Sequence, residues 1–173
     1  MMLRPAAFVA LSIPLLAHTA IAADRGSRGP IRVNLTGGQE DPTVITDARG
    51  ATVLRVQGNT VAYTLRYRGL SDLQQAHIHI GAADTTGGIA AFLCTNLGNG
   101  PAGTPSCPPA PAQVAGVIDA ADVVGPADQG VQPGAIASLI VALRQGLAYV
   151  NLHTAAFPRG EIRGDLPPHD RHD

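Results

Sequence analysis

The chain has 173 residues, a formal net charge of -1, 45% hydrophobic residues and 3% aromatic residues, as expected for one globular domain. All twelve basic side chains are arginines and thirteen side chains are acidic, so the net charge gives no support for binding nucleic acid or an anionic membrane. The absence of lysine excludes Schiff-base chemistry, and the scarcity of aromatic residues argues against stacking platforms for sugars or single strands.

The N-terminus has the pattern of a secretory signal peptide. Arg4 is the only charged residue before Asp24, residues 6–16 are mostly apolar, and Ala20-Ile21-Ala22 offers small residues for cleavage. The apolar run is too short and too interrupted for a membrane anchor. We therefore predict a signal peptide at 1–23, a linker at 24–30, a domain at 31–166 and a disordered tail at 167–173. The mature protein is predicted to be secreted or periplasmic, with no membrane span.

Most segments after the linker alternate apolar and polar residues, which indicates β-strands. The predicted strands cover residues 31–35, 51–56, 60–68, 76–80, 89–93, 114–118, 148–153 and 161–166. Gly58-Asn59 separates the second and third of these, so they are predicted to form a hairpin.

One segment breaks the strand pattern. Its apolar residues Ile136, Leu139, Ile140 and Leu143 recur at helical spacing, and Gly146 is placed where a glycine can end a helix. Residues 135–145 are therefore predicted to be a short amphipathic helix. Together the elements predict an all-β fold: an antiparallel β-sandwich, Greek-key and immunoglobulin-like or superoxide-dismutase-like, with one short α-helix.

The two cysteines, Cys94 and Cys107, enclose a segment rich in Gly and Pro. In an exported chain they have one intramolecular pairing available, so we predict a disulfide. A thiolate metal pair is the alternative, and the spacing is not that of a zinc knuckle.

Three histidines are candidate metal ligands. His77 and His79 stand two apart in Ala76-His77-Ile78-His79-Ile80, so on a strand both imidazoles leave one face while the aliphatic residues leave the other. In its own strand, His153 likewise lies on the face opposite the aliphatic residues. We expect these side chains to point away from the core and, if the strands are neighbours, to form a surface site for copper or zinc. The alternative is that they are ordinary polar residues or loop clamps. His169 and His172 are assigned to the tail.

Other chemistry has less support in the sequence. There is no Gly-x-Ser-x-Gly motif for a serine hydrolase, and no glycine pair follows a phosphate-loop pattern. Glu161, Arg163 and Asp165 share one strand face, which favours an ion-pair ladder over a general acid and base. No catalytic residue is predicted.

Three motifs in series resemble a chordin-type (CHRD) domain. They are Leu35-Thr36-Gly37-Gly38-Gln39-Glu40, then Gly69-Leu70 followed by Ala76-His77-Ile78-His79, then Tyr149-Val150-Asn151-Leu152-His153-Thr154 running into Gly160-Glu161-Ile162-Arg163-Gly164. The resemblance covers residues 31–166 and implies a secreted or periplasmic β-sandwich module. The Gly-Leu turn, the His-x-His strand and the disulfide also resemble copper/zinc superoxide dismutase, although the zinc loop and bridging histidine of that enzyme are absent.

These observations predict an exported binding protein that holds copper or zinc through His77, His79 and His153. Its partners would be the metal ion and an extracellular or periplasmic protein, with no nucleic acid. Two alternatives stay open: a copper-dependent redox enzyme of superoxide-dismutase-like architecture, and a structural or adhesive module without metal.

Overall fold

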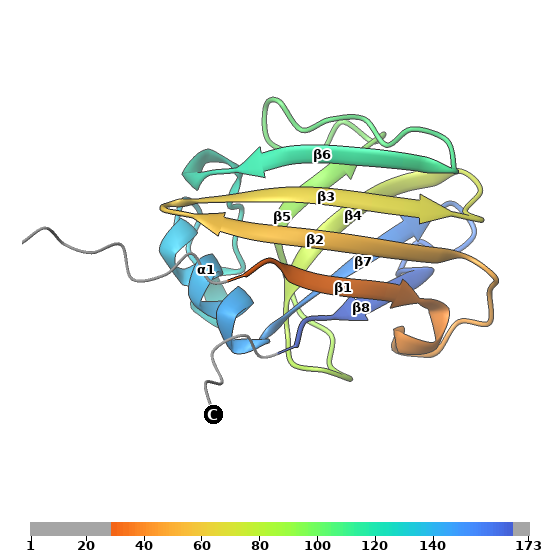
Figure 1. Cartoon of the computed structure of the whole chain (residues 1–173), viewed down its shortest axis with the longest axis horizontal. Coiled ribbons are helices and arrows are strands. Elements are labelled where there is room, and N and C mark those ends of the chain that lie inside the picture. The colour runs from red at the N-terminus through yellow and green to blue at the C-terminus, as the bar shows by residue number, and fades with distance from the viewer. Residues whose placement is uncertain (1–28, 168–173) are drawn as a thin grey trace, which may run out of the picture.

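Eight antiparallel strands form one strongly curled sheet (Figure 1). The computed structural model describes residues 29–167, so the predicted signal peptide, most of the linker and nearly all of the predicted tail lie outside the described residues. The strands are β1 (Ile31–Thr36), β2 (Arg49–Gln57), β3 (Thr60–Arg68), β4 (Leu73–Ile80), β5 (Ile89–Thr95), β6 (Ala112–Ile118), β7 (Ala148–Thr154) and β8 (Ile162–Asp165). Their order in the sheet is β5-β4-β7-β8-β1-β2-β3-β6.

The sheet folds back on itself into two layers. Strands β1, β2, β3 and β6 make the front layer in Figure 1, and β5, β4, β7 and β8 continue from it behind. The layers are joined at β8 and β1 through the single residue pair Thr36 and Arg163. At the other side the bridge between Ala91 and Val123 brings β5 close to the end of β6. The sequence prediction of an all-β sandwich with one helix is therefore confirmed, in the form of a nearly closed sheet.

The β2–β3 hairpin shows how the sequence alternation builds this sandwich. Gly58 has a φ of 57°, a left-handed conformation that glycine adopts without strain, and it reverses the chain at the predicted turn. Tyr63, Leu65 and Tyr67 then face the core, while the arginines between and after them face solvent. Burying one face of each strand in this way is what drives the two layers together.

The helix α1 (Ile136–Gln145) lies at one end of the sandwich (Figure 1). Leu139 and Leu143 are fully buried in the hydrophobic core, whereas Val141 is 51% exposed on the opposite side. Gly146 takes a left-handed φ of 69° and its N–H bonds back to the last turn, as its position in the sequence predicted. The short 3-10 turns η1 (Gly37–Gln39), η2 (Ala120–Asp122) and η3 (Ala127–Gln129) were not predicted.

Among residues 29–167, no helix has the length and apolar character needed to cross a bilayer.

The docked face of α1 can be tested with a matched pair of substitutions. Leu139→Asp places a charge in the core and should lower the free energy of unfolding by more than about 4 kcal/mol or abolish soluble protein. Val141→Asp makes a similar chemical change on the exposed side and should cost less than about 1 kcal/mol. Urea unfolding of the two variants checks this, and equal costs would mean that α1 is not docked through Leu139.

Candidate metal centre

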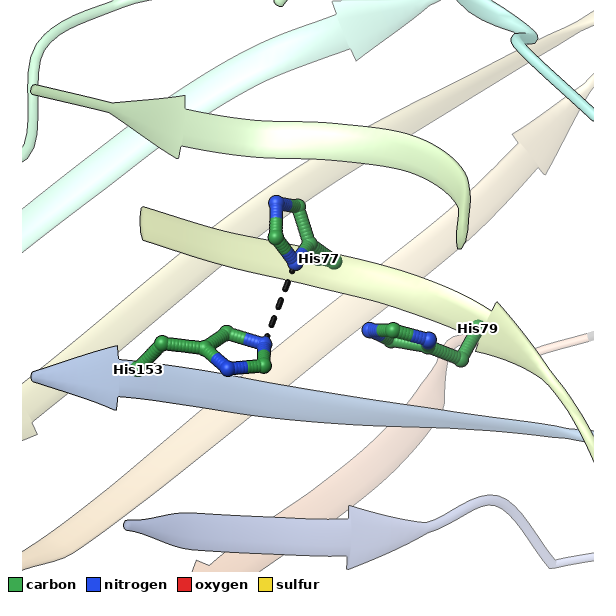
Figure 2. Close-up of side chains that lie close together, drawn as sticks. All are labelled: His77, His79 and His153. Atoms are coloured by element: carbon green, nitrogen blue, oxygen red, sulfur yellow. Dashed lines mark hydrogen bonds between the residues drawn. The ribbon is translucent and has the colours of Figure 1, made fainter. Parts of the chain in front are cut away.

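The fold brings His77, His79 and His153 together, as Figure 2 shows. His77 and His79 are on β4, and His153 is on β7, which pairs with β4 in an antiparallel ladder. Because alternate residues leave the same face of a strand, all three imidazoles leave the outer face of this layer. One ring nitrogen from each histidine lies within 4.8 Å of the others. Neither strand alone would hold three such groups.

Hydrogen bonds to the backbone orient two of the rings. His79 Nδ1 lies 2.9 Å from the carbonyl oxygen of Gly87, and His153 Nδ1 lies 3.1 Å from that of Pro158. A carbonyl oxygen can only accept, so each Nδ1 carries the proton and each Nε2 keeps a lone pair. This pattern, with the outer nitrogen bonded to a carbonyl and the inner one free, is the usual arrangement of histidines that bind metals.

The third ring closes the cluster. His77 Nδ1 lies 3.1 Å from His153 Nε2, so in the metal-free protein His77 donates its Nδ1 proton to the lone pair of His153. His77 also stands edge-on to Phe92 at a centroid distance of 4.5 Å. Among the described residues, Nε2 of His77 and Nε2 of His79 are buried without a hydrogen-bond partner. Such unpartnered polar atoms are costly in a protein interior and mark a place where a ligand can bind.

The histidines are buried, which corrects the expectation of a surface site. The exposed fraction is 0% for His77 and 7% each for His79 and His153. The alternation along β4 does divide its side chains between two faces, but both faces are covered. The loop carrying Gly87 and the loop carrying Pro158 lie over the histidine face and supply its hydrogen bonds.

Burial keeps the imidazoles neutral. It lowers the pKa of His77 to about 2, with a further lowering from its histidine neighbours. It lowers the pKa of His79 to about 4, against the raising effect of the bond to Gly87, and it lowers the pKa of His153 as well. Neutral imidazole is the form that binds a metal. The three imidazoles are therefore already neutral near neutral pH, which is the state that metal binding requires.

The spacing fits a metal after a small movement. Nitrogens bound to one zinc ion at about 2.0–2.1 Å in tetrahedral geometry lie roughly 3.3–3.4 Å apart. His77 and His153 are already near that separation, at 3.1 Å. The His79 nitrogen lies within 4.8 Å of the others, so it has to move inward by at most about 1.4 Å. Binding through Nδ1 of His77 would also require the proton that this nitrogen donates to His153 to leave it.

A stack of flat groups fixes the position of His79. The Tyr149 ring is parallel to His79, with centroids 4.8 Å apart and planes at 7°. The Arg163 guanidinium lies 3.6 Å from the centre of the Tyr149 ring and pairs with Asp165 at 2.6 Å. Arg163 is only 1% exposed, so its charge depends on these partners. The predicted ladder therefore exists between Arg163 and Asp165, while Glu161 accepts hydrogen bonds from Thr46 and Thr154.

Sequence analysis did not single out Glu40, which is also buried near this cluster. Burial raises the pKa of Glu40 to about 7, against the lowering effect of Arg163. Gly160 passes so close that a Cβ there would meet the Glu40 carboxylate. Glu40 ends the first of the three CHRD-like motifs and Gly160 lies in the third, so membership of these motifs was the signal in the sequence that could have pointed to Glu40.

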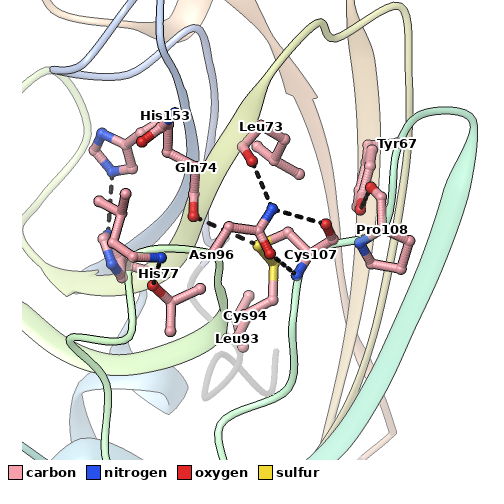
Figure 3. Close-up of a disulfide and its surroundings, with 12 residues drawn as sticks. Tyr67, Leu73, Gln74, His77, Leu93, Cys94, Asn96, Cys107, Pro108 and His153 are labelled. Carbon is pink, nitrogen blue, oxygen red and sulfur yellow. Dashed lines mark hydrogen bonds between the residues drawn. A yellow bond between two sulfur atoms is a disulfide. The ribbon is translucent and has the colours of Figure 1, made fainter.

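The structure joins Cys94 and Cys107 in a disulfide, as predicted (Figure 3). Both cysteines are buried, with Cys94 0% and Cys107 4% exposed, whereas most of the loop between them is exposed. Asn96 fixes the segment beside it, donating to the carbonyls of Leu73 and Cys107 and accepting the Cys107 N–H. The bridge thus ties the end of the Gly- and Pro-rich loop to β5, and Asn96 ties it to the start of β4, the strand that carries two of the histidines. His169 and His172 lie outside the described residues.

The chain matches a known protein family. The family model described as the CHRD domain matches residues 31–166, which is most of the chain and nearly all of the described part. Neither the curated proteins nor the solved structures contain a match.

The lowered histidine pKa values predict how the stability of the metal-free protein depends on pH. Between about pH 4 and 6.5 the unfolded chain protonates its histidines and the folded chain does not, so the unfolded state binds more protons and stability falls as pH falls. Each neutral histidine contributes about 1.4 kcal/mol per pH unit. The raised pKa of Glu40 acts in the opposite direction between pH 4.5 and 7 and offsets part of this.

A single variant isolates the histidine contribution. His77→Phe keeps a ring against Phe92 but cannot titrate, so its stability should change by about 1.4 kcal/mol less per pH unit than that of the wild type. Urea unfolding with a chelator at several values between pH 4.5 and 6 measures both slopes. Parallel curves would show that His77 is protonated in the folded protein over this range.

The disulfide is expected to stabilise the fold without being required for its architecture. Replacing both Cys94 and Cys107 by alanine should lower the free energy of unfolding by about 3 kcal/mol, because a loop with a sequence separation of 13 is no longer closed in the unfolded chain. In the wild type, reduction under native conditions should be slow because both sulfurs are buried. A variant as stable as the wild type, or rapid native-state reduction, would contradict this placement.

Proposed function

The chain belongs to the CHRD-domain family, and on that premise we propose that it is an exported binding module that holds one copper or zinc ion through His77, His79 and His153. The observation that carries the proposal is the orientation of the rings. His79 and His153 each donate a hydrogen bond from Nδ1 to a backbone carbonyl. This leaves two Nε2 lone pairs and one nitrogen of His77 in a single cluster. When bound, the metal ion would be coordinated by three neutral nitrogens and would bring a positive charge into the site.

The donor set favours copper or zinc over harder ions. Imidazole suits both metals, whereas calcium and magnesium prefer oxygen ligands. No carboxylate or thiol among the described residues joins the three histidines in the cluster. For such a set the affinity order of divalent ions places Cu(II) above Zn(II), so copper should bind more tightly when both are offered.

Export is part of the proposal. The N-terminal pattern of one arginine, an apolar run and small residues supports a signal peptide. The disulfide between Cys94 and Cys107 supports an oxidising compartment, because such bonds persist outside the cytoplasm. An extracellular or periplasmic protein is a further proposed partner.

Burial favours binding over turnover. A copper-dependent redox enzyme needs a coordination position that substrate can reach, whereas the three histidines are at most 7% exposed. The same loops that orient the rings therefore limit access to the site. A structural module without metal would leave the unpartnered Nε2 atom of His79 unexplained.

The proposal predicts a defined metal stoichiometry that depends on each histidine. Protein dialysed against Cu(II) or Zn(II) should retain one ion per chain by elemental analysis. His79→Asn and His153→Asn keep an amide N–H for the carbonyls of Gly87 and Pro158 but remove Nε2, and His77→Phe removes both nitrogens. Each should weaken affinity by at least about 100-fold, more than the loss of an outer hydrogen bond causes.

His169→Asn with His172→Asn serves as the matched control, since it removes two imidazoles assigned to the tail. This control should bind as the wild type does. If the control loses the metal and the strand variants retain it, the site is in the tail. If no variant changes binding, or if the wild type retains no metal, the structural alternative is correct. Turnover of superoxide or peroxide by the copper-loaded protein would instead favour the redox enzyme.

A further inference from the structure

The outer face of the front layer, opposite the histidine layer, carries a concentrated positive charge. Its outward positions on β1, β2 and β3 hold five exposed arginines: Arg32, Arg49, Arg55, Arg66 and Arg68. These are five of the eight arginines among residues 29–167, and strands β1, β2, β3 and β6 contain no acidic residue. The net charge of -1 thus conceals a strongly uneven distribution. We call this surface the arginine face.

Strand register places three of the arginines close together. Arg49 lies directly opposite Arg68 in the β2–β3 ladder, and Arg66 is two residues from Arg68 on the same face. Like charges directly opposite each other destabilise a sheet. Among residues 29–167 the only ion pair is Arg163 with Asp165, so none of the five arginines has an acidic partner there. An anion bound between them would relieve this repulsion.

A shallow, open hollow lies beside three of these arginines. Its volume is about 580 Å³, and it is lined by Arg49, Arg66 and Arg68 together with Tyr67, Gln113 and small or apolar neighbours such as Ala51 and Pro111. Arg66 donates to the side chain of Gln113 at 2.6 Å, and Arg49 donates to the carbonyls of Thr46 and Ala48. These contacts hold the guanidinium groups beside the hollow while leaving donors free, since each guanidinium has five N–H groups.

The remaining outward positions are small or polar. Beside the arginines they carry Asn34, Thr36, Ala51, Val53, Gln57, Thr60, Ala62, Thr64, Gln113, Ala115 and Val117. Such a floor lets an extended ligand approach the sheet closely, and its amides and hydroxyls can bond to ligand hydroxyl groups. Arg49 and Arg55 are six residues apart, so the charges extend about 20 Å along β2.

We propose that the arginine face binds a linear acidic polysaccharide whose carboxylates pair with the arginines and whose hydroxyls bond to the polar floor. The planar guanidinium matches a carboxylate through two parallel hydrogen bonds. The charge, the hollow and the row of hydrogen-bonding side chains all match such a ligand. This site is independent of the proposed metal centre, which is on the other layer.

The same surface is less suited to two other polyanions. Proteins that lie on membranes usually insert large apolar or aromatic side chains, and the outward apolar residues here are only Ala and Val. Single-stranded nucleic acid is usually stacked on aromatic rings, and no outward position of these four strands is aromatic. The polysaccharide would therefore be held by ion pairs and hydrogen bonds and not by ring stacking. Anionic membranes and DNA are therefore included as alternative ligands in the test.

The test compares matched charge removals in the full chain treated with a chelator. Arg66→Gln with Arg68→Gln removes two charges from the hollow, and Arg144→Gln with Arg159→Gln removes two charges elsewhere. Binding of an oligogalacturonate, with neutral dextran as the reference, is measured by calorimetry at several salt concentrations. The wild type should bind oligogalacturonate and not dextran, with affinity falling as salt rises. The first variant should bind at least about tenfold more weakly and the second within about twofold of wild type.

Arg66→Lys with Arg68→Lys separates geometry from charge, and it should restore only part of the lost affinity because ammonium lacks the planar fork. Circular dichroism and urea unfolding should show that all variants fold like the wild type, since the substituted arginines are at least partly exposed. Equal losses in the two glutamine variants, or no binding by the wild type, would overturn the proposal. Tighter binding to phosphatidylserine vesicles or to DNA at the same salt would overturn the choice of ligand.

Discussion

The hydrogen bonds from His79 to Gly87 and from His153 to Pro158 are the contacts on which the site depends. Each fixes the proton on the outer nitrogen of a buried ring and leaves the lone pair of the other nitrogen inside the cluster. Each also ties a loop to the outer face of the β4 and β7 layer. The loops therefore determine both the chemistry of the rings and their removal from water, and the low pKa values follow from that burial.

Strand pairing, the disulfide and a stack of planar side chains hold the histidines in this arrangement. The pairing of β4 with β7 sets the spacing of the three rings, and the disulfide with Asn96 holds the loop after β5 against the start of β4. The stack of Arg163, Tyr149 and His79 holds the third ring from the side. The other layer takes no part in the cluster. Its outer face is left free for a separate interaction, and the uncompensated arginines are concentrated there.

Sequence alone predicted each of the eight strands, the helix and the three histidines of the cluster, because these depend on periodicity. Alternation in Ala76-His77-Ile78-His79-Ile80 correctly separated the two faces of β4. It could not show that loops cover the histidine face, since such coverage depends on contacts between residues such as His79 and Gly87 that follow no period. For the same reason Glu40 was missed, although it lies in a quoted motif. Net charge could not reveal the arginine face, because only strand register places Arg49 opposite Arg68.

The ring states of the histidines test the central claim most directly, by long-range proton–nitrogen NMR on the metal-free protein. At pH 5.5 the account predicts neutral His79 and His153 with the proton on Nδ1, and no titration of His77 down to about pH 4. Adding Zn(II) should shift Nε2 of His79 and His153 and one ring nitrogen of His77 together. Three imidazoles that titrate near pH 6.5 and do not respond to zinc would contradict the account.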